Sequence, residues 1–167
     1  MRLYIVRHAV AFPHGTPGMD EDERPLTKEG IKKMQEAAEG LRAIDCLPEA
    51  VLSSPLPRSR QTAEIVLEVL GKQIPLAVIE ALSPSGSRQD VFREIRRRQK
   101  SESLMLVGHQ PSLGEIAGEI AWGSPEQYVE LKKGGACALE IEGMTPVPRG
   151  SLVWLLTPSI LRALRAR

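Results

Sequence analysis

The sequence predicts one α/β domain over residues 1–167, with helices on both faces of a mostly parallel central sheet. Two observations lead to this three-layer α/β/α arrangement. Short apolar runs alternate along the chain with segments whose apolar residues recur at helical spacing, and this alternation is typical of βαβ units. Hydrophobic residues make up 42% and charged residues 26% of the 167 residues, the balance of a globular protein large enough to bury a core.

The first half of the chain predicts three strands joined by two helices. Thr27 is the expected N-cap of the first helix, because Leu26 and Ile31 flank it as a hydrophobic staple. Gly71 is the expected end of the second helix, which follows Pro55. The predicted elements are a buried strand at 2–7, a Pro-, Gly- and acid-rich loop at 9–26, a helix from Thr27 to about 43, a strand at 50–54, a helix up to Gly71 and a strand at 74–79.

The second half continues the alternation and then ends in a pair of strands. Pro111 is expected to open a helix whose apolar face includes Leu113 and Ile116. The predicted elements are a helix at 87–100 that is basic on its outer side, a strand at 103–109, the helix that begins near Pro111, strands at 136–142 and 151–157, and a basic C-terminal helix.

Composition and charge narrow the possible partners and the compartment. The formal net charge is +1 and aromatic residues are only 4%, so we expect no nucleic-acid partner. No apolar run approaches the roughly 20 residues that span a bilayer, and Arg7 and His8 interrupt the early apolar run that a signal peptide would need. Cys46 and Cys137 form no CxxC pattern, as expected of reduced thiols. The expectation is a cytoplasmic protein without a membrane partner.

Arginine and histidine side chains follow three of the predicted strands at the point where each strand ends. Arg7 and His8 end the first strand, Arg58 lies in the segment after the second, and His109 ends the strand at 103–109. In α/β sheets, ligands bind at the carboxyl ends of the strands. Two arginines and two histidines that meet there would form a pocket for a dianion.

The chemistry of these residues favours a phosphoryl group. Guanidinium groups match two phosphate oxygens at once and stay charged at any relevant pH. The helix N-termini after Pro55 and Pro111 would add N–H groups and a positive dipole end at the same edge of the sheet. A neutral imidazole is a competent nucleophile, and nearby arginines would keep its pKa low. The sequence therefore predicts a phosphate site that contains its own nucleophile.

Other kinds of site fit the sequence less well. A zinc site from His8, His14 and His109 lacks HxxxH or CxxC spacing, and the adjacent arginines would repel a cation, so we expect no metal. His14 lies in the loop and is expected to be solvated. No GxxxxGK[ST] motif occurs, which argues against an NTPase.

Five short blocks resemble the histidine phosphatase superfamily, which has the phosphoglycerate mutase-like fold. They are "RHA" at 7–9, "ERPLTKEG", "SSPLPRSRQTAE", "LVGHQPSLGEIA" and "KKGGACALEIEG", and together they extend over nearly the whole chain. The signature of the superfamily is "RHG", and the variant "RHA" with Ala9 resembles the SixA-type phosphohistidine phosphatases.

The resemblance implies a role for each matching residue. His8 would be the nucleophile that becomes phosphorylated, Arg7 and Arg58 would bind the phosphoryl oxygens, and His109 would complete the pocket. Water would then hydrolyse the phosphohistidine, with no metal or organic cofactor. Glu80 lies in about the segment where many members carry a general acid, although a loop carboxylate with no catalytic part is an equal alternative.

The predicted function is that of a phosphohistidine phosphatase acting in protein dephosphorylation and signal transduction. Only about 20 residues separate Leu82 from the strand at 103–109, so an open site could admit a phosphorylated protein side chain. Arg24, in the charged run of the first loop, could reach an anionic substrate. The alternatives are a phosphomonoesterase or mutase that takes a small phosphorylated metabolite and, from a different class, a non-catalytic phosphate-binding module. The oligomeric state stays open.

Overall fold

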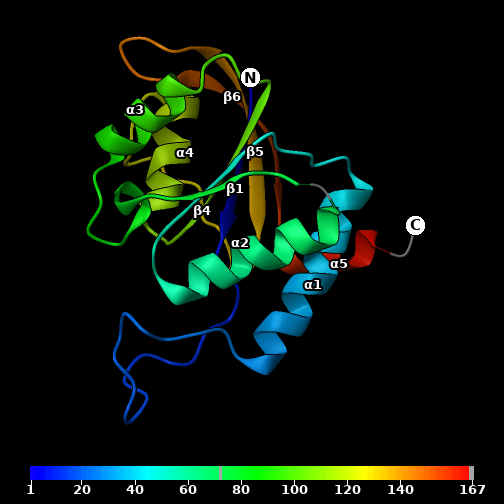
Figure 1. Ribbon diagram of the computed structural model, residues 1–167. Coiled ribbons are helices and arrows are strands. Elements are labelled where there is room, and N and C mark those ends of the chain that lie inside the picture. The colour runs from blue at the N-terminus through cyan, green and yellow to red at the C-terminus, as the bar shows by residue number, and fades with distance from the viewer. Residues whose placement is uncertain (72, 166–167) are drawn as a thin grey trace.

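The computed structural model describes residues 1–71 and 73–165 (Figure 1). Within this part of the chain, six strands form one sheet in the order β3-β2-β4-β1-β5-β6. The elements are β1 Arg2–Arg7, α1 Lys28–Ala43, β2 Val51–Ser53, α2 Pro57–Leu70, β3 Leu76–Val78, the short 3-10 helix η1 Glu80–Leu82, α3 Arg88–Arg97, β4 Ser103–Gly108, α4 Ser112–Trp122, β5 Ala136–Gly143, β6 Arg149–Leu156 and α5 Pro158–Leu164.

The sheet is mostly parallel, as the sequence predicts. Strands β3, β2, β4 and β1 run in one direction, and β5 pairs antiparallel with both β1 and β6. Strand β1 lies between β4 and β5, and its last residue, Arg7, is in register with Gly108 at the end of β4. The residues that follow β1 and β4 therefore leave the sheet side by side.

Helices cover both faces of the sheet, which gives the predicted three layers. Helices α1, α2 and α5 pack on one face and α3 and α4 on the other (Figure 1). In β1, Tyr4 and Val6 contact the α1–α2 side, whereas Leu3 and Ile5 contact the α3–α4 side. A strand that is buried on both faces needs apolar side chains in both directions, which explains the unbroken apolar run at the N-terminus.

The predicted ends of the first two helices are confirmed. The hydroxyl of Thr27 accepts a hydrogen bond from the Gly30 amide at 3.0 Å, and Gly71 ends α2 in the left-handed conformation with φ 64°. Gly30 also lies against the loop, because a Cβ there would collide with the carbonyl oxygen of Val10. The start of α1 is thus fixed both by its cap and by the loop that precedes it.

Helix α3 is shorter than predicted. It ends at Arg97 rather than at residue 100, and Arg98 already has a non-helical ψ of 20°. Ile95 is the last apolar residue on its buried face, and the residues at 96–100 are all basic or polar. Without a further apolar side chain to bury, tertiary packing does not extend the helix.

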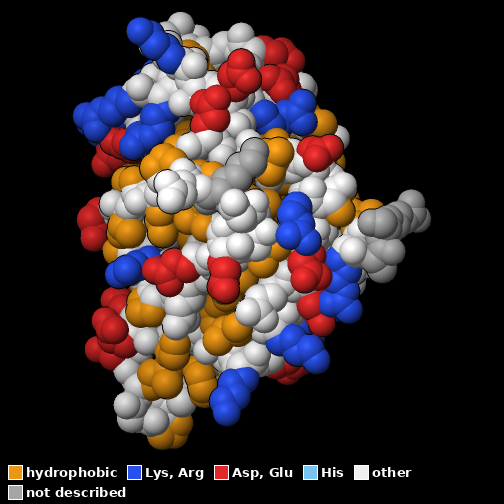
Figure 2. All heavy atoms as spheres, turned by 45° about the vertical axis from the view of Figure 1, so that its right-hand side comes forward, with side chains coloured by type: hydrophobic (Ala, Val, Ile, Leu, Met, Phe, Trp, Pro, Cys, Tyr) orange, Lys and Arg blue, Asp and Glu red, His pale blue; other side chains and the backbone are white. Residues whose placement is uncertain are grey.

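The surface carries charges of both signs. On the face shown in Figure 2, Lys and Arg side chains are interspersed with Asp and Glu, in keeping with the net charge of +1. None of the helices among residues 1–71 and 73–165 is long and apolar enough to cross a membrane. Cys46 and Cys137 are buried, unpaired thiols on opposite faces of the sheet.

Candidate active site

Two histidines lie next to each other at the carboxyl ends of β1 and β4. The backbone amide of His8 donates to the carbonyl of Gly108 at 3.0 Å, which continues the β1–β4 ladder by one residue. Both rings are buried, and their centroids are 5.2 Å apart. The pairing of the two strands therefore brings His8 and His109 together, as the sequence predicts.

The hydrogen bond of His8 defines which of its ring nitrogens is free. Nδ1 lies 2.8 Å from the carbonyl oxygen of Ala9, and because a carbonyl only accepts, Nδ1 carries the proton. Nε2 is then the nitrogen with a lone pair. Burial, together with the charges of Arg58 and Arg7, lowers the pKa of His8 to about 4, although the Ala9 bond opposes this shift. At neutral pH the ring is uncharged, the state in which an imidazole acts as a nucleophile.

His109 is held by two serine hydroxyls. Its Nε2 lies 2.8 Å from Ser54 Oγ and 3.3 Å from Ser59 Oγ. Ser54 Oγ also accepts from the amide of Leu56, so its own proton is free to point at Nε2. The two hydroxyls hold the ring of His109 in place through its Nε2. Burial, the nearby His8 ring and the charges of Arg58 and Arg7 lower the pKa of His109 to about 3, so this ring is neutral at pH 7 as well.

Arg7 and Arg58 present buried donors without partners. Arg7 donates from NH1 to the carbonyl of Leu131 at 2.8 Å, and Arg58 donates from NH1 to the carbonyl of Glu21 at 3.3 Å. Within the described residues, the buried Nε of each side chain has no hydrogen-bond partner. A buried unpaired donor is costly, the more so on a charged group. Both side chains also line the cavity described below, where their guanidinium groups can attract an oxyanion.

The loop between β1 and α1 is tied to the start of α2. The amide of Ala9 donates to Thr62 Oγ1 at 3.0 Å, and Thr62 Oγ1 donates to the carbonyl of Arg58 at 2.7 Å. Further along, the Leu26 amide donates to Gln61 Oε1 at 2.7 Å. These bonds fix Arg58 relative to the residues that follow β1.

Arg24 lies in the same loop, at the edge of the site. Its Nε donates to Glu21 Oε1 at 2.8 Å, and NH1 donates to the carbonyl of Phe12 at 2.6 Å. The side chain is largely buried, with 13% of its surface exposed. Arg24 is therefore ion-paired with Glu21, and the negative charge of Glu21 offsets its positive charge at the edge of the site.

A cavity of about 320 Å³ connects these groups. It brings together Arg7, His8, Arg58 and His109, as well as Arg24. Sequence reasoning missed Lys133, Gln110 and His14, which complete the lining with Pro13 and Pro84.

The amino-acid sequence carries a different amount of information about each of these three residues. Gln110 directly follows His109, and that adjacency was a usable signal. Lys133 lies in the "KKGG" turn before β5, whose path no periodicity reveals. His14 was expected to be solvated; it is exposed but lies at the rim of the cavity, with Nδ1 2.6 Å from Glu21 Oε2.

The structure does not bring Glu80 into this cavity. Glu80 begins η1 just after β3, the edge strand, and β2 and β4 separate β3 from β1. It lines a different cavity, on the outer side of α3, with Asp90, Arg93, Glu94 and Arg97 among its neighbours. No carboxylate lines the cavity around His8 in the described part of the chain. The same residues also contain no group of three or more His, Cys, Asp or Glu side chains that could hold a metal ion.

Comparison with known proteins connects this geometry to a family. The sequence profile of the histidine phosphatase superfamily (branch 1) matches residues 3–83. An uncharacterized protein of Picosynechococcus sp. is 38% identical over 141 residues, which cover 83% of this chain and 84% of that protein. The chain belongs to the histidine phosphatase superfamily. Membership confirms the predicted enzyme class, a phosphatase.

Solved structures of the superfamily share the fold. The protein histidine phosphatase SixA complexed with tungstate superimposes with a TM-score of 0.84 at 24% identity, covering 96% of this chain and 99% of that one. The alpha-ribazole phosphatase from Shigella flexneri gives a TM-score of 0.75 at 21% identity, with coverage of 95% and 97%. These similarities confirm the predicted phosphoglycerate mutase-like architecture, and the two neighbours differ in the substrates that their names state.

Proposed function

We propose that this chain hydrolyses phosphoramidate bonds, with phosphohistidine in proteins as its main substrate, through a covalent intermediate on His8. The Nε2 lone pair of His8 attacks phosphorus, a new N–P bond forms, and the bond to the leaving group breaks. Water then attacks the phosphoryl group, the N–P bond to His8 breaks, and inorganic phosphate departs. The hydrogen bond from Nδ1 to Ala9 keeps the ring in the tautomer that this first step needs.

Arg7, Arg58 and His109 are proposed to bind the transferring phosphoryl group. The guanidinium groups of the two arginines are charged donors at the cavity, and the neutral ring of His109 lies beside them. In phosphoryl transfer, negative charge is spread over the equatorial oxygens, so donors fixed in advance around them stabilise the transition state. Because the donors are already in place, binding requires little reorganisation.

The single observation that favours a P–N substrate is that, among the described residues, no carboxylate lines the His8 cavity and the one carboxylate lining the adjoining cavity, Glu115, is ion-paired with Arg88. An alkoxide leaving group is strongly basic and needs a proton from an enzymic acid, whereas an imidazole leaving group takes its proton readily from solvent. Glu80, the candidate acid, lies elsewhere. The similarity to the protein histidine phosphatase SixA supports the same proposal.

A panel of substrates tests this proposal. It contains a protein phosphohistidine, a phosphoarginine or phospholysine peptide, a small aryl phosphate and a phosphoglycerate, all at one pH. We expect the highest kcat/KM for phosphohistidine, activity on the aryl phosphate because phenolate leaves easily, and little on phosphoglycerate. Preference for phosphoglycerate or another alkyl ester would contradict the proposal and favour a general phosphomonoesterase. Binding without turnover of any substrate would favour the phosphate-binding module.

A further inference from the structure

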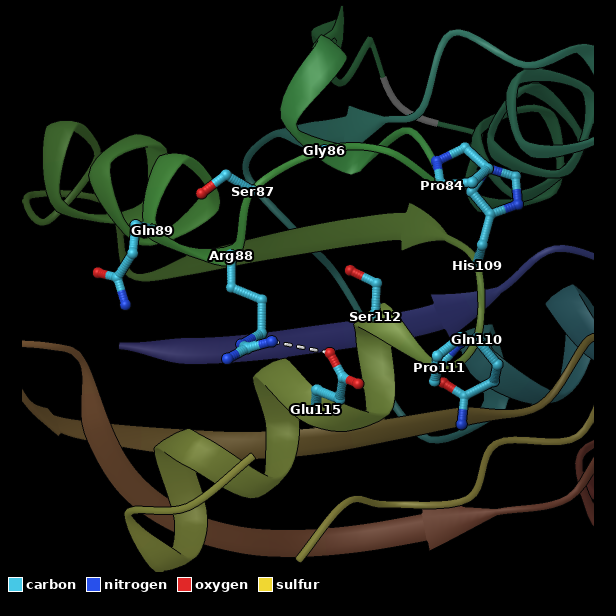
Figure 3. A pocket seen from close by; sticks show the side chains of 10 residues that line it. All are labelled: Pro84, Gly86, Ser87, Arg88, Gln89, His109, Gln110, Pro111, Ser112 and Glu115. Carbon is cyan, nitrogen blue, oxygen red and sulfur yellow. Dashed lines mark hydrogen bonds and ion pairs between the residues drawn. The ribbon is translucent and has the colours of Figure 1, made fainter. Parts of the chain in front are cut away.

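A second cavity adjoins the one around His8 and has no assigned role. Its volume is about 340 Å³, and it lies between the loop that leads into α3 and the beginning of α4 (Figure 3). It shares Pro84, His109 and Gln110 with the first cavity. We propose that this second cavity binds the leaving group, and that its cluster of Arg88, Glu115 and Glu119 selects polar leaving groups that are neutral or cationic over anionic ones. The proposal rests on the function proposed above.

The position of the second cavity suits a leaving group. Neither Arg7 nor His8 lines it, and it joins the first cavity at Pro84, His109 and Gln110. In phosphoryl transfer, the attacking and leaving atoms are roughly in line on opposite sides of phosphorus. A phosphoryl group held by Arg7 and Arg58 therefore directs its fourth substituent away from His8, and the adjoining cavity, which neither Arg7 nor His8 lines, gives that substituent room to extend.

The walls of the second cavity are formed in advance. Gly86 shapes the loop on one side, because a Cβ there would collide with the carbonyl oxygen of Ala81. On the other side, Gly114 lies so close to Val129 that a Cβ would collide with its carbonyl oxygen. Gln110 fixes this wall, since its side chain accepts from the Gly114 amide at 2.8 Å and donates to the Val129 carbonyl at 3.0 Å. Preformed walls lower the entropic cost of binding.

The charges around the second cavity differ in sign from those around His8. Arg88 donates from NH1 to Glu115 Oε2 at 2.9 Å and from Nε to Glu119 Oε2 at 3.1 Å. Figure 3 shows the side chains of Arg88 and Glu115 pointing toward each other across the cavity. One guanidinium faces two carboxylates, so this cluster carries a net negative charge. The cavity around His8 is lined by cationic side chains and no carboxylate among the described residues.

This difference predicts a preference among leaving groups. A bound phosphoryl dianion balances the charges of Arg7 and Arg58, and Glu21 balances Arg24, which leaves Lys133 as the remaining cation among the described residues that line the first cavity. Lys133 does not line the second cavity, so a leaving group bound there interacts mainly with its own surroundings. There it meets the negative Arg88 cluster and the hydroxyls of Ser87 and Ser112. Like charges at short range repel, and the repulsion is larger where the groups are partly buried, as Glu119 is with 14% of its side chain exposed. A polar group with no negative charge is therefore the best fit.

Three aryl phosphates that differ only in the para substituent test the preference. Aminomethyl, hydroxymethyl and carboxymethyl groups give a cationic, a neutral and an anionic leaving group. Because the charged substituents also change the acidity of the phenol, each kcat/KM is compared after division by the rate constant for uncatalysed hydrolysis of the same compound. We expect kcat/KM for the cationic compound to exceed that for the anionic one by about 10-fold at low salt, and the ratio to shrink as added salt screens the charges. Equal kcat/KM values, or a preference for the anion, would overturn the inference.

Two variants should move the ratio in opposite directions. Glu115→Gln removes one negative charge and should lower the ratio of cationic to anionic turnover, whereas Arg88→Gln leaves two carboxylates and should raise it. General loss of structure would lower both rates together and cannot produce opposite shifts. Glu64→Gln is the matched control, because Glu64 is half exposed on α2 and pairs with Arg60, away from both cavities. If Glu64→Gln shifts the ratio of cationic to anionic turnover as much as Glu115→Gln does, the preference does not originate in the second cavity.

The result also separates this inference from the proposed function. If the wild-type protein hydrolyses the neutral aryl phosphate and phosphohistidine without any charge preference, only the role of the second cavity is wrong. If it hydrolyses none of these substrates, the function proposed above is wrong.

Discussion

Replacing Arg58 by alanine should reduce activity much more than stability. Among the described residues, the side chain of Arg58 has one hydrogen bond, from NH1 to the carbonyl of Glu21, and its buried Nε has none. The guanidinium lines the cavity and has five N–H groups, so it can give two charge-assisted hydrogen bonds to phosphoryl oxygens. At about 1.5 kcal/mol each, their loss removes about 3 kcal/mol of transition-state stabilisation. This corresponds to a decrease in kcat/KM of about 10²-fold.

The effect of the same change on stability should be small. Burial lowers the pKa of Arg58, which means that the charged form is poorly solvated in the folded protein. Alanine removes this unfavourable charge along with the buried unpaired donor, and this offsets the loss of packing by the methylene groups. We expect the free energy of unfolding to change by less than about 1 kcal/mol, measured by denaturant titration.

Two further variants make the test specific. Arg58→Lys should recover only part of the activity, because an ammonium group cannot form two parallel hydrogen bonds. Arg60→Ala, two residues along α2 and with 52% of the side chain exposed, should behave like the wild-type protein. Full activity of Arg58→Lys would refute the reasoning. So would an Arg58→Ala variant that is largely unfolded but whose folded fraction binds phosphate with unchanged affinity.

Two further variants and one pH titration test the roles given to His8, Glu80 and His109. His8→Ala should abolish turnover and leave the circular dichroism spectrum unchanged; an acid-labile phosphoenzyme trapped with the wild-type protein should be absent, and substantial residual activity would exclude the covalent route. Glu80→Gln should leave phosphohistidine hydrolysis within about twofold, because a general acid would contribute about 10²–10⁴-fold; a large loss would restore Glu80 as a candidate. In NMR titrations, the rings of His8 and His109 should stay neutral down to about pH 5 and protonate near 4 and 3, respectively. Because these folded-state pKa values lie below that of an unfolded histidine, the stability that the neutral rings contribute above about pH 6.5 should be lost as the pH falls toward 4 and below; protonation near pH 6.5 would contradict the burial argument.

Much of the site could be predicted because its main residues are attached directly to strands. Arg7, His8 and His109 occupy the last or next positions of two buried strands, and apolar runs locate such strands well. Arg58 follows in the same way because Pro57 begins a helix directly after β2. For these four residues, the position in the sequence determines the position in space.

The remaining features depend on how segments pack, which no periodicity records. Glu80 matched the family by segment, but the order of the strands places β3 at the sheet edge and Glu80 in another cavity. His14 and Lys133 reach the site through turns whose path depends on tertiary contacts. The pairing of Arg88 with Glu115 joins two helices that are far apart in the sequence, so the second cavity could not be anticipated from either helix alone.

The register of one strand pair has a consequence for how the protein becomes active. Arg7 pairs with Gly108, and only this register places His8 beside His109; a slip by one residue would turn the side chains of β1 to the opposite faces of the sheet. Pairing strands so distant in sequence requires closing a long loop, which has an entropic cost. Recovery of phosphatase activity during refolding should therefore mark completion of the β1–β4 ladder, and no partly folded form that lacks this ladder can contain a working site.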